Sequence, residues 1–237
     1  ALKAIVAPQR GLRTAVSQFS VSINRGEIVG LLGPNGAGKS TVLNALCGDV
    51  VPERGTISID NQDVTKLTSW QRAPFVARVF QDPMAGTCAN LTIEENMAIA
   101  MKRGERRTLK MALNKEHREK FRFQLSRLKL GLENRLQDPI GLLSGGQRQA
   151  ISLIMAVLEP MKILALDEHT AALDPKTAAF ILELTREIVE ENQLTALMVT
   201  HSMHQALELG NRTVMLDEGR VIFDVRDEER KGLTVPD

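Results

Sequence analysis

The sequence predicts an α/β fold in which helices alternate with buried parallel strands. Ile163 to Leu166 and Ala196 to Val199 are short, continuous apolar runs, and the helical pattern from Lys176 to Glu190 separates them. This strand, helix, strand order is typical of a parallel sheet with helices packed on its faces. A third apolar run, Ile28 to Leu32, ends at a glycine-rich segment. With 237 residues, 43% of them hydrophobic, the chain is long enough for one such domain with its own core.

Further strands are expected toward both ends of the chain. Leu2 to Ile23 contains short β-rich runs, which predict a small β layer before the first buried strand. Thr56 to Ile59 and Phe75 to Phe80 are additional strand candidates. The tail from Arg212 to Val225 predicts a hairpin that turns at Asp217-Glu218-Gly219.

The middle of the chain has the pattern of a helical insertion. From Asp82 to about Leu142 the strand signals vanish and helix formers dominate, as in Ile93 to Met101 and Glu116 to Leu130. A further helical pattern follows Ser144 and ends at Glu159-Pro160. We therefore expect helices to interrupt the α/β core.

A phosphate-binding pattern, G-x-x-x-x-G-K-[ST], follows the Ile28 to Leu32 strand as Gly33-Pro34-Asn35-Gly36-Ala37-Gly38-Lys39-Ser40. Glycines let the backbone wrap closely around phosphates, and N–H groups at a helix start point toward them. Lys39 can reach the β and γ phosphates, and Ser40 is placed to coordinate Mg²⁺. A glycine-rich turn with a chance Lys-Ser pair is the alternative, but the flanking strand and helix favour the phosphate loop. The segment predicts a P-loop ATPase with ATP and Mg²⁺ as cofactors, bound by Asn35, Gly36, Ala37, Gly38, Lys39, Ser40 and Thr41.

Two adjacent carboxylates, Asp167 and Glu168, follow the buried strand Ile163 to Leu166. The carboxyl ends of parallel strands face one crevice, so both side chains are expected near the phosphate loop. Asp167 would hold Mg²⁺ through water, and Glu168 could orient or deprotonate the attacking water. Two solvated acids at a strand end would be the alternative, and the accompanying phosphate loop favours the site.

The segment Leu143-Ser144-Gly145-Gly146-Gln147-Arg148-Gln149, at a helix start, resembles the signature sequence of the ABC ATPase family. Gln81 resembles the Q-loop glutamine of that family, Ala172-Leu173-Asp174 its D-loop, and His201 its switch histidine. The resemblance runs from about Phe19 to Gly219. It implies a P-loop NTPase (RecA-like) core with an antiparallel β subdomain and an inserted α-helical subdomain. The expected division of this single ABC ATPase domain is 1–81 and 159–237 for the core and 82–158 for the helical subdomain with the signature.

The family resemblance implies a head-to-tail dimer in which the phosphate loop of one subunit and the signature of the other close on one ATP. The N–H groups at the helix start in the signature would face phosphate, with contacts from Ser144, Gly145, Gly146 and Gln147. His201 would contact the γ phosphate, Gln81 would sense Mg²⁺ and the attacking water, and Asp174 would communicate across the interface. The catalytic set is expected to be Glu168, His201, Lys39 and Gln81, and the metal set Ser40, Gln81 and Asp167.

Each of these assignments has a plainer alternative. Gln81 alone would be an ordinary polar residue after a strand, and a lone His201 is more often structural than catalytic. His201 and His204 could also form a metal pair on one helix turn, although no third ligand is evident in the sequence.

The sequence departs from the family pattern at two positions. Many members place an aromatic residue upstream of the phosphate loop to stack on adenine, but this chain contains no tyrosine. Arg10 falls near that position and could stack on the base in its place. His169 stands where the family usually has proline, and the sequence suggests no mechanism for it.

The resemblance also implies partners. ATP-driven closure of a homodimer, or of a paired ATPase subunit, would move integral membrane permease subunits encoded as separate chains. An extracytoplasmic solute-binding protein is expected as well, with the ATPase peripheral to the cytoplasmic face of the inner (plasma) membrane. The segment Asp167 to Asp174 resembles importers of small, amino-acid-like solutes. A soluble ABC ATPase acting on ribosomes or DNA is the competing class, and this chain shows neither a second signature nor a heptad insertion.

Charge and cysteine content add little to the functional argument. The net charge of +1 favours no nucleic-acid partner, and Cys47 and Cys88 suggest ordinary reduced thiols. Between Lys102 and Arg135, however, twelve Lys or Arg residues stand against four Asp or Glu residues. This run is either a solvated helical face or a surface close to acidic lipid headgroups or an acidic partner.

Overall fold

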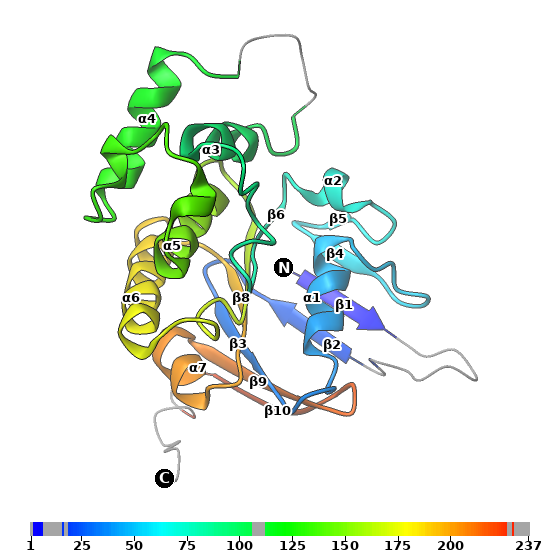
Figure 1. The fold of residues 1–237 in the computed structure, drawn as a ribbon. Helices are drawn as coiled ribbons and strands as arrows, with labels where there is room; N and C mark the ends of the chain where they lie inside the picture. The colour runs from blue at the N-terminus through cyan, green and yellow to red at the C-terminus, as the bar shows by residue number, and fades with distance from the viewer. Residues whose placement is uncertain (1, 7–15, 17–18, 106–111, 227–228, 230–237) are drawn as a thin grey trace.

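A computed structural model describes residues 2–6, 16, 19–105, 112–226 and 229 of the chain (Figure 1). Within these residues, two β-sheets form the centre of the molecule. The first is antiparallel and contains, in spatial order, β2 (Phe19–Ile23), β1 (Leu2–Val6), β4 (Ile57–Ile59) and β5 (Gln62–Asp63). The second contains, in spatial order, β10 (Arg220–Arg226), β9 (Arg212–Asp217), β3 (Ile28–Leu32), β8 (Ala196–Val199), β7 (Ile163–Asp167) and β6 (Val76–Val79).

The second sheet is parallel except at one edge. Strands β9, β3, β8, β7 and β6 pair in parallel, and β10 pairs antiparallel with β9. The hairpin predicted for the tail is confirmed, since β9 and β10 are joined at Glu218 and Gly219, both of which have positive φ. The buried parallel strands confirm the predicted α/β class.

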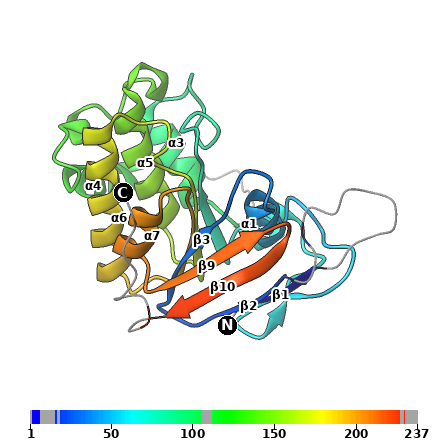
Figure 2. The same cartoon turned by 90° about the horizontal axis from the view of Figure 1, so that it is seen from below.

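Side chains of the parallel sheet alternate between two hydrophobic cores. In β7, Leu164 and Leu166 belong to one core, whereas Ile163 and Ala165 belong to the other. This alternation follows from the strand geometry, in which successive side chains point to opposite faces. One face is covered by helices α3 (Ile93–Met101), α4 (Lys115–Ser126), α5 (Gly145–Val157) and α6 (Pro175–Glu191), and the other by α1 (Lys39–Cys47) and the antiparallel sheet (Figures 1 and 2).

Helices α3 and α4 both begin at side-chain caps, and residues with positive φ follow the end of α4. Thr92 caps α3 and forms a capping box with Glu95, and Asn114 caps α4. Helix α4 ends at Ser126, four residues before the predicted end at Leu130. The chain turns there because Lys129 and Gly131 have φ values of 54° and 72°, which a continuing helix does not allow.

Smaller helices complete the fold. Helix α2 (Ser69–Arg72) follows β5, and α7 (Met203–Leu209) follows β8 and packs on β3. A Cβ on Gly30 would lie 2.8 Å from the Cβ of Ala206, so glycine permits this close packing. Two short 3₁₀ turns lie at Leu132–Asn134 and Ile140–Leu142. In the part of the chain that the structure describes, no helix has the length and apolar character needed to span a bilayer.

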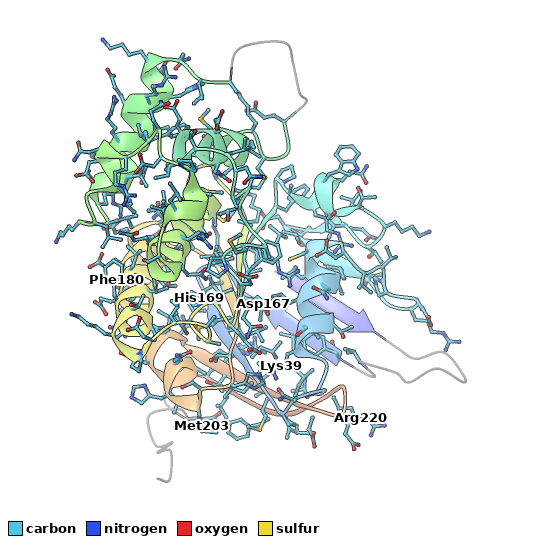
Figure 3. The ribbon with its side chains drawn as sticks, in the orientation of Figure 1. Lys39, Asp167, His169, Phe180, Met203 and Arg220 are labelled. Atoms are coloured by element: carbon cyan, nitrogen blue, oxygen red, sulfur yellow. The ribbon has the colours of Figure 1, made fainter. Side chains whose placement is uncertain are left out.

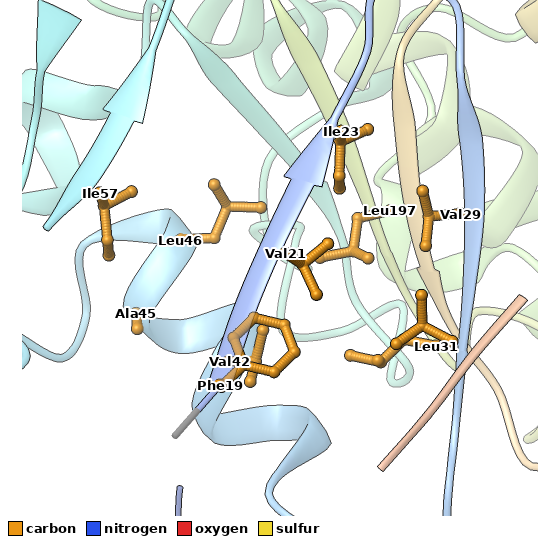
Figure 4. Close-up of a pocket in the computed structure, with 11 residues that line it drawn as sticks. Phe19, Val21, Ile23, Val29, Leu31, Val42, Ala45, Leu46, Ile57 and Leu197 are labelled. Carbon is orange, nitrogen blue, oxygen red and sulfur yellow. The ribbon is translucent and has the colours of Figure 1, made fainter. Parts of the chain in front are cut away.

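The core between the antiparallel sheet and the parallel sheet is apolar (Figure 4). Phe19, Val21 and Ile23 of β2 meet Val29 and Leu31 of β3, and α1 closes the side. The remaining gap has a volume of about 20 Å³ and an apolar lining. It offers no hydrogen-bond partners to water, so this space is packed interior and the ligand site must lie elsewhere.

Candidate functional site

The carboxyl ends of four parallel strands carry the residues that the sequence singled out. In the sheet register, Leu31 of β3 lies opposite Val199 of β8, and Val199 lies opposite Asp167 of β7. Val79 of β6 pairs with Leu166 of β7. Gly33 and Glu168 directly follow β3 and β7, and His201 and Gln81 are the second residues after β8 and β6. Four segments far apart in sequence therefore open at the same edge of the sheet, which is where open α/β sheets bind ligands.

The phosphate loop connects β3 to α1 through backbone conformations that suit glycine. Gly33, Gly36 and Gly38 have φ values of 150°, 83° and 103°. A Cβ on Gly33 would lie 2.2 Å from the carbonyl oxygen of Leu216, so no side chain fits at that position. Gly38 is the N-cap of α1, and no side chain caps this helix start. The N–H groups of the first turn are thus available to an anion.

Lys39 lies across the loop. Its Nζ donates to the carbonyl oxygens of Gly33, at 2.7 Å, and Pro34, at 3.1 Å, and the residue is 4% exposed. Burial lowers the pKa of Lys39, and the nearby Glu168 carboxylate acts in the opposite direction. The ammonium is held in the concave side of the loop, where a phosphate would partner its charge.

Glu168 and His201 form a pair at the ends of β7 and β8. The Nε2 atom of His201 lies 2.8 Å from Oε1 of Glu168, and the Glu168 side chain is 14% exposed. Glu168 has a φ of 43°, a left-handed conformation that is unfavourable for a residue with a side chain. Its N–H donates to the carbonyl of Val199 at 2.9 Å, which holds this conformation in place.

Asp167 is bound by an arginine that the sequence reasoning missed. Nη2 of Arg78, on β6, lies 2.5 Å from Oδ2 of Asp167, and Nη1 donates to Asn44 and Asp49 at 2.9 Å and 3.1 Å. The signal was visible, since Arg78 interrupts the apolar strand candidate Phe75 to Phe80 and a buried guanidinium needs partners. The identity of the partner depends on the pairing of β6 with β7, which the sequence does not reveal.

The signature segment begins α5 beside the start of α6. Ser144 accepts a hydrogen bond from the Gln147 N–H, and Gln147 Oε1 accepts one from the Ser144 N–H, both at 3.2 Å. A Cβ on Gly146 would lie 2.2 Å from Cγ2 of Thr177, so the two helices touch there. Asp174 caps α6 through the Thr177 N–H, and bonds to Thr177 lower the pKa of Asp174. The signature and the D-loop residue are therefore neighbours.

His169 joins the end of β7 to both of these helices. Its ring Nε2 lies 3.0 Å from Oγ1 of Thr185 on α6, and its carbonyl accepts from Nε2 of Gln149 on α5 at 2.7 Å. Gln149 Nε2 also donates to the carbonyl of Phe80 at 3.1 Å. Burial lowers the pKa of His169 to about 4. The residue that departs from the family pattern is thus a buried, neutral connector (Figure 3).

The donors at this edge fit ATP and Mg²⁺ by their chemistry. A hydroxyl (Ser40), a carboxylate (Asp167) and an amide (Gln81) are the oxygen ligands that Mg²⁺ prefers, and Ser40 and Gln81 are exposed. Figure 3 shows Lys39 and Asp167 at the centre of the view, between the helices and the β-rich part. Arg10, expected near the adenine, lies outside the described residues. In the described ranges, no group of three His, Cys, Asp or Glu residues could hold a metal ion, and Nδ1 of His204 lies 3.4 Å from Glu208.

Comparisons with known proteins agree with this geometry. The model of the ABC transporter family matches residues 16–171. A tyrosine transport ATP-binding protein of Clostridioides difficile is 44% identical over 222 residues, which cover 94% of this chain and 88% of that protein. A thiamine import ATP-binding protein of Salmonella choleraesuis is 36% identical over 212 residues, which cover 90% of this chain and 85% of that protein.

Solved structures match over nearly the whole chain. A dimeric ATP-binding cassette in a post-hydrolysis state, bound to ADP and phosphate, superposes with a TM-score of 0.79 at 27% identity and covers 95% of this chain and 98% of that one. A nucleotide-free ATP-binding cassette from an ABC transporter superposes with a TM-score of 0.81 at 26% identity and covers 97% and 92%.

Proposed function

The chain belongs to the ABC transporter family, and from this premise we propose that its strand-end residues bind Mg-ATP and hydrolyse it in a head-to-tail dimer that drives solute transport. The chain is an ABC ATPase. One observation carries the assignment of the site: the uncapped start of α1 with Lys39 lies at the same sheet edge as the Glu168–His201 pair. An anion-binding helix start beside a strained, restrained carboxylate is suited to phosphoryl transfer to water.

The proposed mechanism assigns each residue one task. The N–H groups from Asn35 to Thr41 and the Lys39 ammonium bind and orient the triphosphate. Bound Mg²⁺ would neutralise charge on the β and γ phosphates, held by Ser40, Gln81 and Asp167. Glu168 orients the attacking water and accepts its proton. The imidazole of His201 restrains Glu168 before ATP binds and contacts the γ phosphate once ATP is bound.

A second copy of the chain is proposed to complete each site. Helix α1 packs on one face of the parallel sheet and α5 on the other, so their starts belong to different parts of the molecule. Ser144, Gly145, Gly146 and Gln147 would contact the partner's ATP, and Asp174 would lie at the interface because α5 and α6 begin together. The dimeric cassette that superposes on this chain supports such an arrangement. The proposed division into a core of 1–81 and 159–237 and a helical subdomain of 82–158 places the two halves of the site in different subdomains.

Membrane subunits are the proposed recipients of the movement. A groove of about 650 Å³ lies between β6 and α3, and its lining includes Trp70, Phe80 and Ile99. The exposed fractions of Trp70 and Ile99 are 72% and 52%, so large apolar side chains are presented at its rim. A cytoplasmic helix of a permease subunit would fit this groove beside Gln81. The chain would then lie peripherally at the cytoplasmic face of the membrane.

The proposed cargo is a small, amino-acid-like solute, imported with the help of an extracytoplasmic solute-binding protein. The relative named for tyrosine transport supports this substrate class, since it is 44% identical to this chain. Uptake of radiolabelled tyrosine would be measured in cells with and without the gene and its neighbouring permease genes. Uptake that is independent of this gene would contradict the substrate proposal while leaving the ATPase assignment intact.

The hydrolytic site is tested by Glu168→Gln. This variant should bind ATP as the parent does, hydrolyse it about 10²- to 10⁴-fold more slowly and accumulate as an ATP-bound dimer. Nucleotide binding, phosphate release and molar mass by light scattering report the three effects. A variant with unimpaired turnover would overturn the role of Glu168.

A further inference from the structure

Arg78 is a charged residue inside a buried strand. It lies between Ala77 and Val79 in β6, both about 1% exposed, and its own side chain is 15% exposed. Removing a guanidinium from water is unfavourable unless anions and acceptors surround it. The contacts of Arg78 should therefore indicate why this position holds a charge.

The guanidinium of Arg78 connects the Asp167 carboxylate to the end of α1. Nη2 bonds to Oδ2 of Asp167 at 2.5 Å, while Nη1 donates to Oδ1 of Asn44 and Oδ2 of Asp49 at 2.9 Å and 3.1 Å. The guanidinium carbon also lies 4.6 Å from the centroid of the Phe80 ring. Arg78 thus has one partner in the proposed metal site and three partners outside it.

The two carboxylates that share Arg78 differ in their surroundings. The side chain of Asp167 is 14% exposed, and that of Asp49 is 45% exposed. Without a cation, Asp167 would be a poorly hydrated negative charge, which Arg78 neutralises. With Mg²⁺ nearby, a guanidinium on the same carboxylate would repel the metal. Asn44, Asp49 and Phe80 can retain Arg78 when Asp167 turns to another cation.

Building on the proposed metal role of Asp167, we propose that Arg78 is a positioning residue that occupies Asp167 in the metal-free protein and competes with Mg²⁺ for it. Arg78 keeps the carboxylate paired and oriented until Mg-ATP enters, and then it rests on Asn44 and Asp49. The concentration of Mg²⁺ at which the site fills is therefore set in part by a residue that does not touch the nucleotide.

The test measures metal affinity directly. Mn²⁺ replaces Mg²⁺ as the probe, and free Mn²⁺ is followed by electron paramagnetic resonance in the full chain with a non-hydrolysable ATP analogue. Arg78→Met, which keeps an unbranched side chain over Phe80, should bind Mn²⁺ about tenfold more tightly because the competing charge is gone. Arg186→Met is the matched control, since Arg186 on α6 is paired with Glu183 on the same helix and with Glu208 on α7. Its affinity for Mn²⁺ should equal that of the parent.

Two further variants show whether Arg78 acts through its charge and its partners. Arg78→Lys keeps the charge but lacks the forked N–H donors of the guanidinium, so its affinity for Mn²⁺ should lie between those of the parent and Arg78→Met. This variant also provides the test if Arg78→Met misfolds. Asp49→Asn should weaken Mn²⁺ binding in the parent by severalfold. In the Arg78→Met background the same change should have a much smaller effect.

The outcomes separate this inference from the proposed function. Asp167→Asn should weaken Mn²⁺ binding strongly. If it does so while Arg78→Met and Arg78→Lys bind Mn²⁺ no more tightly than the parent, the competition is refuted and the metal site stands. If Asp167→Asn leaves the affinity unchanged, the metal role of Asp167 falls and the inference falls with it.

Discussion

The starts of helices α1 and α5 differ in backbone conformation and in capping. The N-cap of α1, Gly38, is left-handed with a φ of 103°, and the N-cap of α5, Ser144, is extended with a φ of −62° and a ψ of 159°. Helix α1 begins after Gly38, and no side chain caps it. Helix α5 begins after Ser144, whose side chain and that of Gln147 satisfy each other's backbone N–H groups. Among the described helices of seven residues or more, α1 alone lacks a side-chain cap. The N–H groups of an uncapped helix start are free to bind an external anion. At a self-capped start, some of these N–H groups already donate to side chains, so an anion binds in addition to those hydrogen bonds.

The two helices are also stabilised at different places: α1 at its far end, and α5 at its start. At the far end of α1, the fully buried Arg72 donates to the carbonyls of Ala45 and Leu46, so the helix is stabilised there despite its open start. The start of α5 packs instead on α6 at Gly146 and Thr177. In the proposed dimer, the first helix start would hold ATP within one chain, and the second would present a firm surface to a partner's ATP.

The largest expected effect comes from the first helix start. Lys39→Ala removes the ammonium that lies across the phosphate loop, and the rate of ATP hydrolysis should fall about 10²- to 10³-fold with weaker ATP binding. Both quantities are measured by steady-state phosphate release and by titration with a fluorescent ATP analogue. Retained activity would mean that α1 does not bind the reacting phosphate, and the contrast with α5 would lose its meaning.

The next largest expected effect is a recovery of ATPase activity that depends on the starts of both helices, α1 and α5. Ser144→Arg places a bulky cation where the partner's ATP would bind, so this variant and Lys39→Ala should each be nearly inactive alone. In an equimolar mixture, mixed dimers pair the intact loop of one chain with the intact signature of the other. Activity should recover to about a quarter of the parent rate, because half of the dimers carry one intact site of two. No recovery on mixing would contradict sites shared between chains.

Much of this contrast was predictable from sequence because motifs and strand ends coincide. The apolar runs predicted β3, β7 and β8, and Glu168 was expected near the phosphate loop that starts at Gly33 for a general topological reason. His201 was assigned to the site only through the family resemblance. The helix that follows the phosphate loop was likewise predicted from its pattern, and α1 is found at Lys39–Cys47. The segments α2 and β5 were not predicted, since four and two residues are too few to show a period.

Contacts between distant segments could not be predicted. Arg78 and Asp167 are 89 residues apart, and their meeting depends on β6 lying beside β7 at the sheet edge. The sequence alone did not indicate a role for His169, because its contacts are with Thr185 and Gln149 on two different helices. Position in three dimensions, and not residue type, distinguishes these side chains from ordinary polar ones.

His169, which connects the end of β7 to α5 and α6, should make stability depend on pH. Its pKa of about 4 in the folded protein is below the ordinary value of 6.5, so between these values the unfolded chain binds a proton that the folded chain does not. Stability is therefore lost as the pH falls, by about 2 kcal/mol from pH 7.5 to pH 5 for this residue. Urea unfolding at both pH values measures the loss. His169→Asn should show a correspondingly smaller loss, and an equal loss in both proteins would contradict a buried neutral ring.

The smallest expected effects distinguish two neighbouring glycines of the signature, Gly146, which packs on α6, and Gly145, which is proposed to contact the partner. A Cβ on Gly146 would lie 2.2 Å from Thr177, whereas one on Gly145 would meet only Leu173 at 3.7 Å. Gly146→Ala should lower the free energy of unfolding by about 1–2 kcal/mol because α5 and α6 must separate slightly. Gly145→Ala should leave that free energy within about 0.5 kcal/mol of the parent value yet weaken the ATP-dependent dimer, since this exposed position would face the partner in the proposed dimer. Chemical unfolding and light scattering with ATP distinguish the two variants, and equal destabilisation by both would mean that the whole start of α5 serves packing alone.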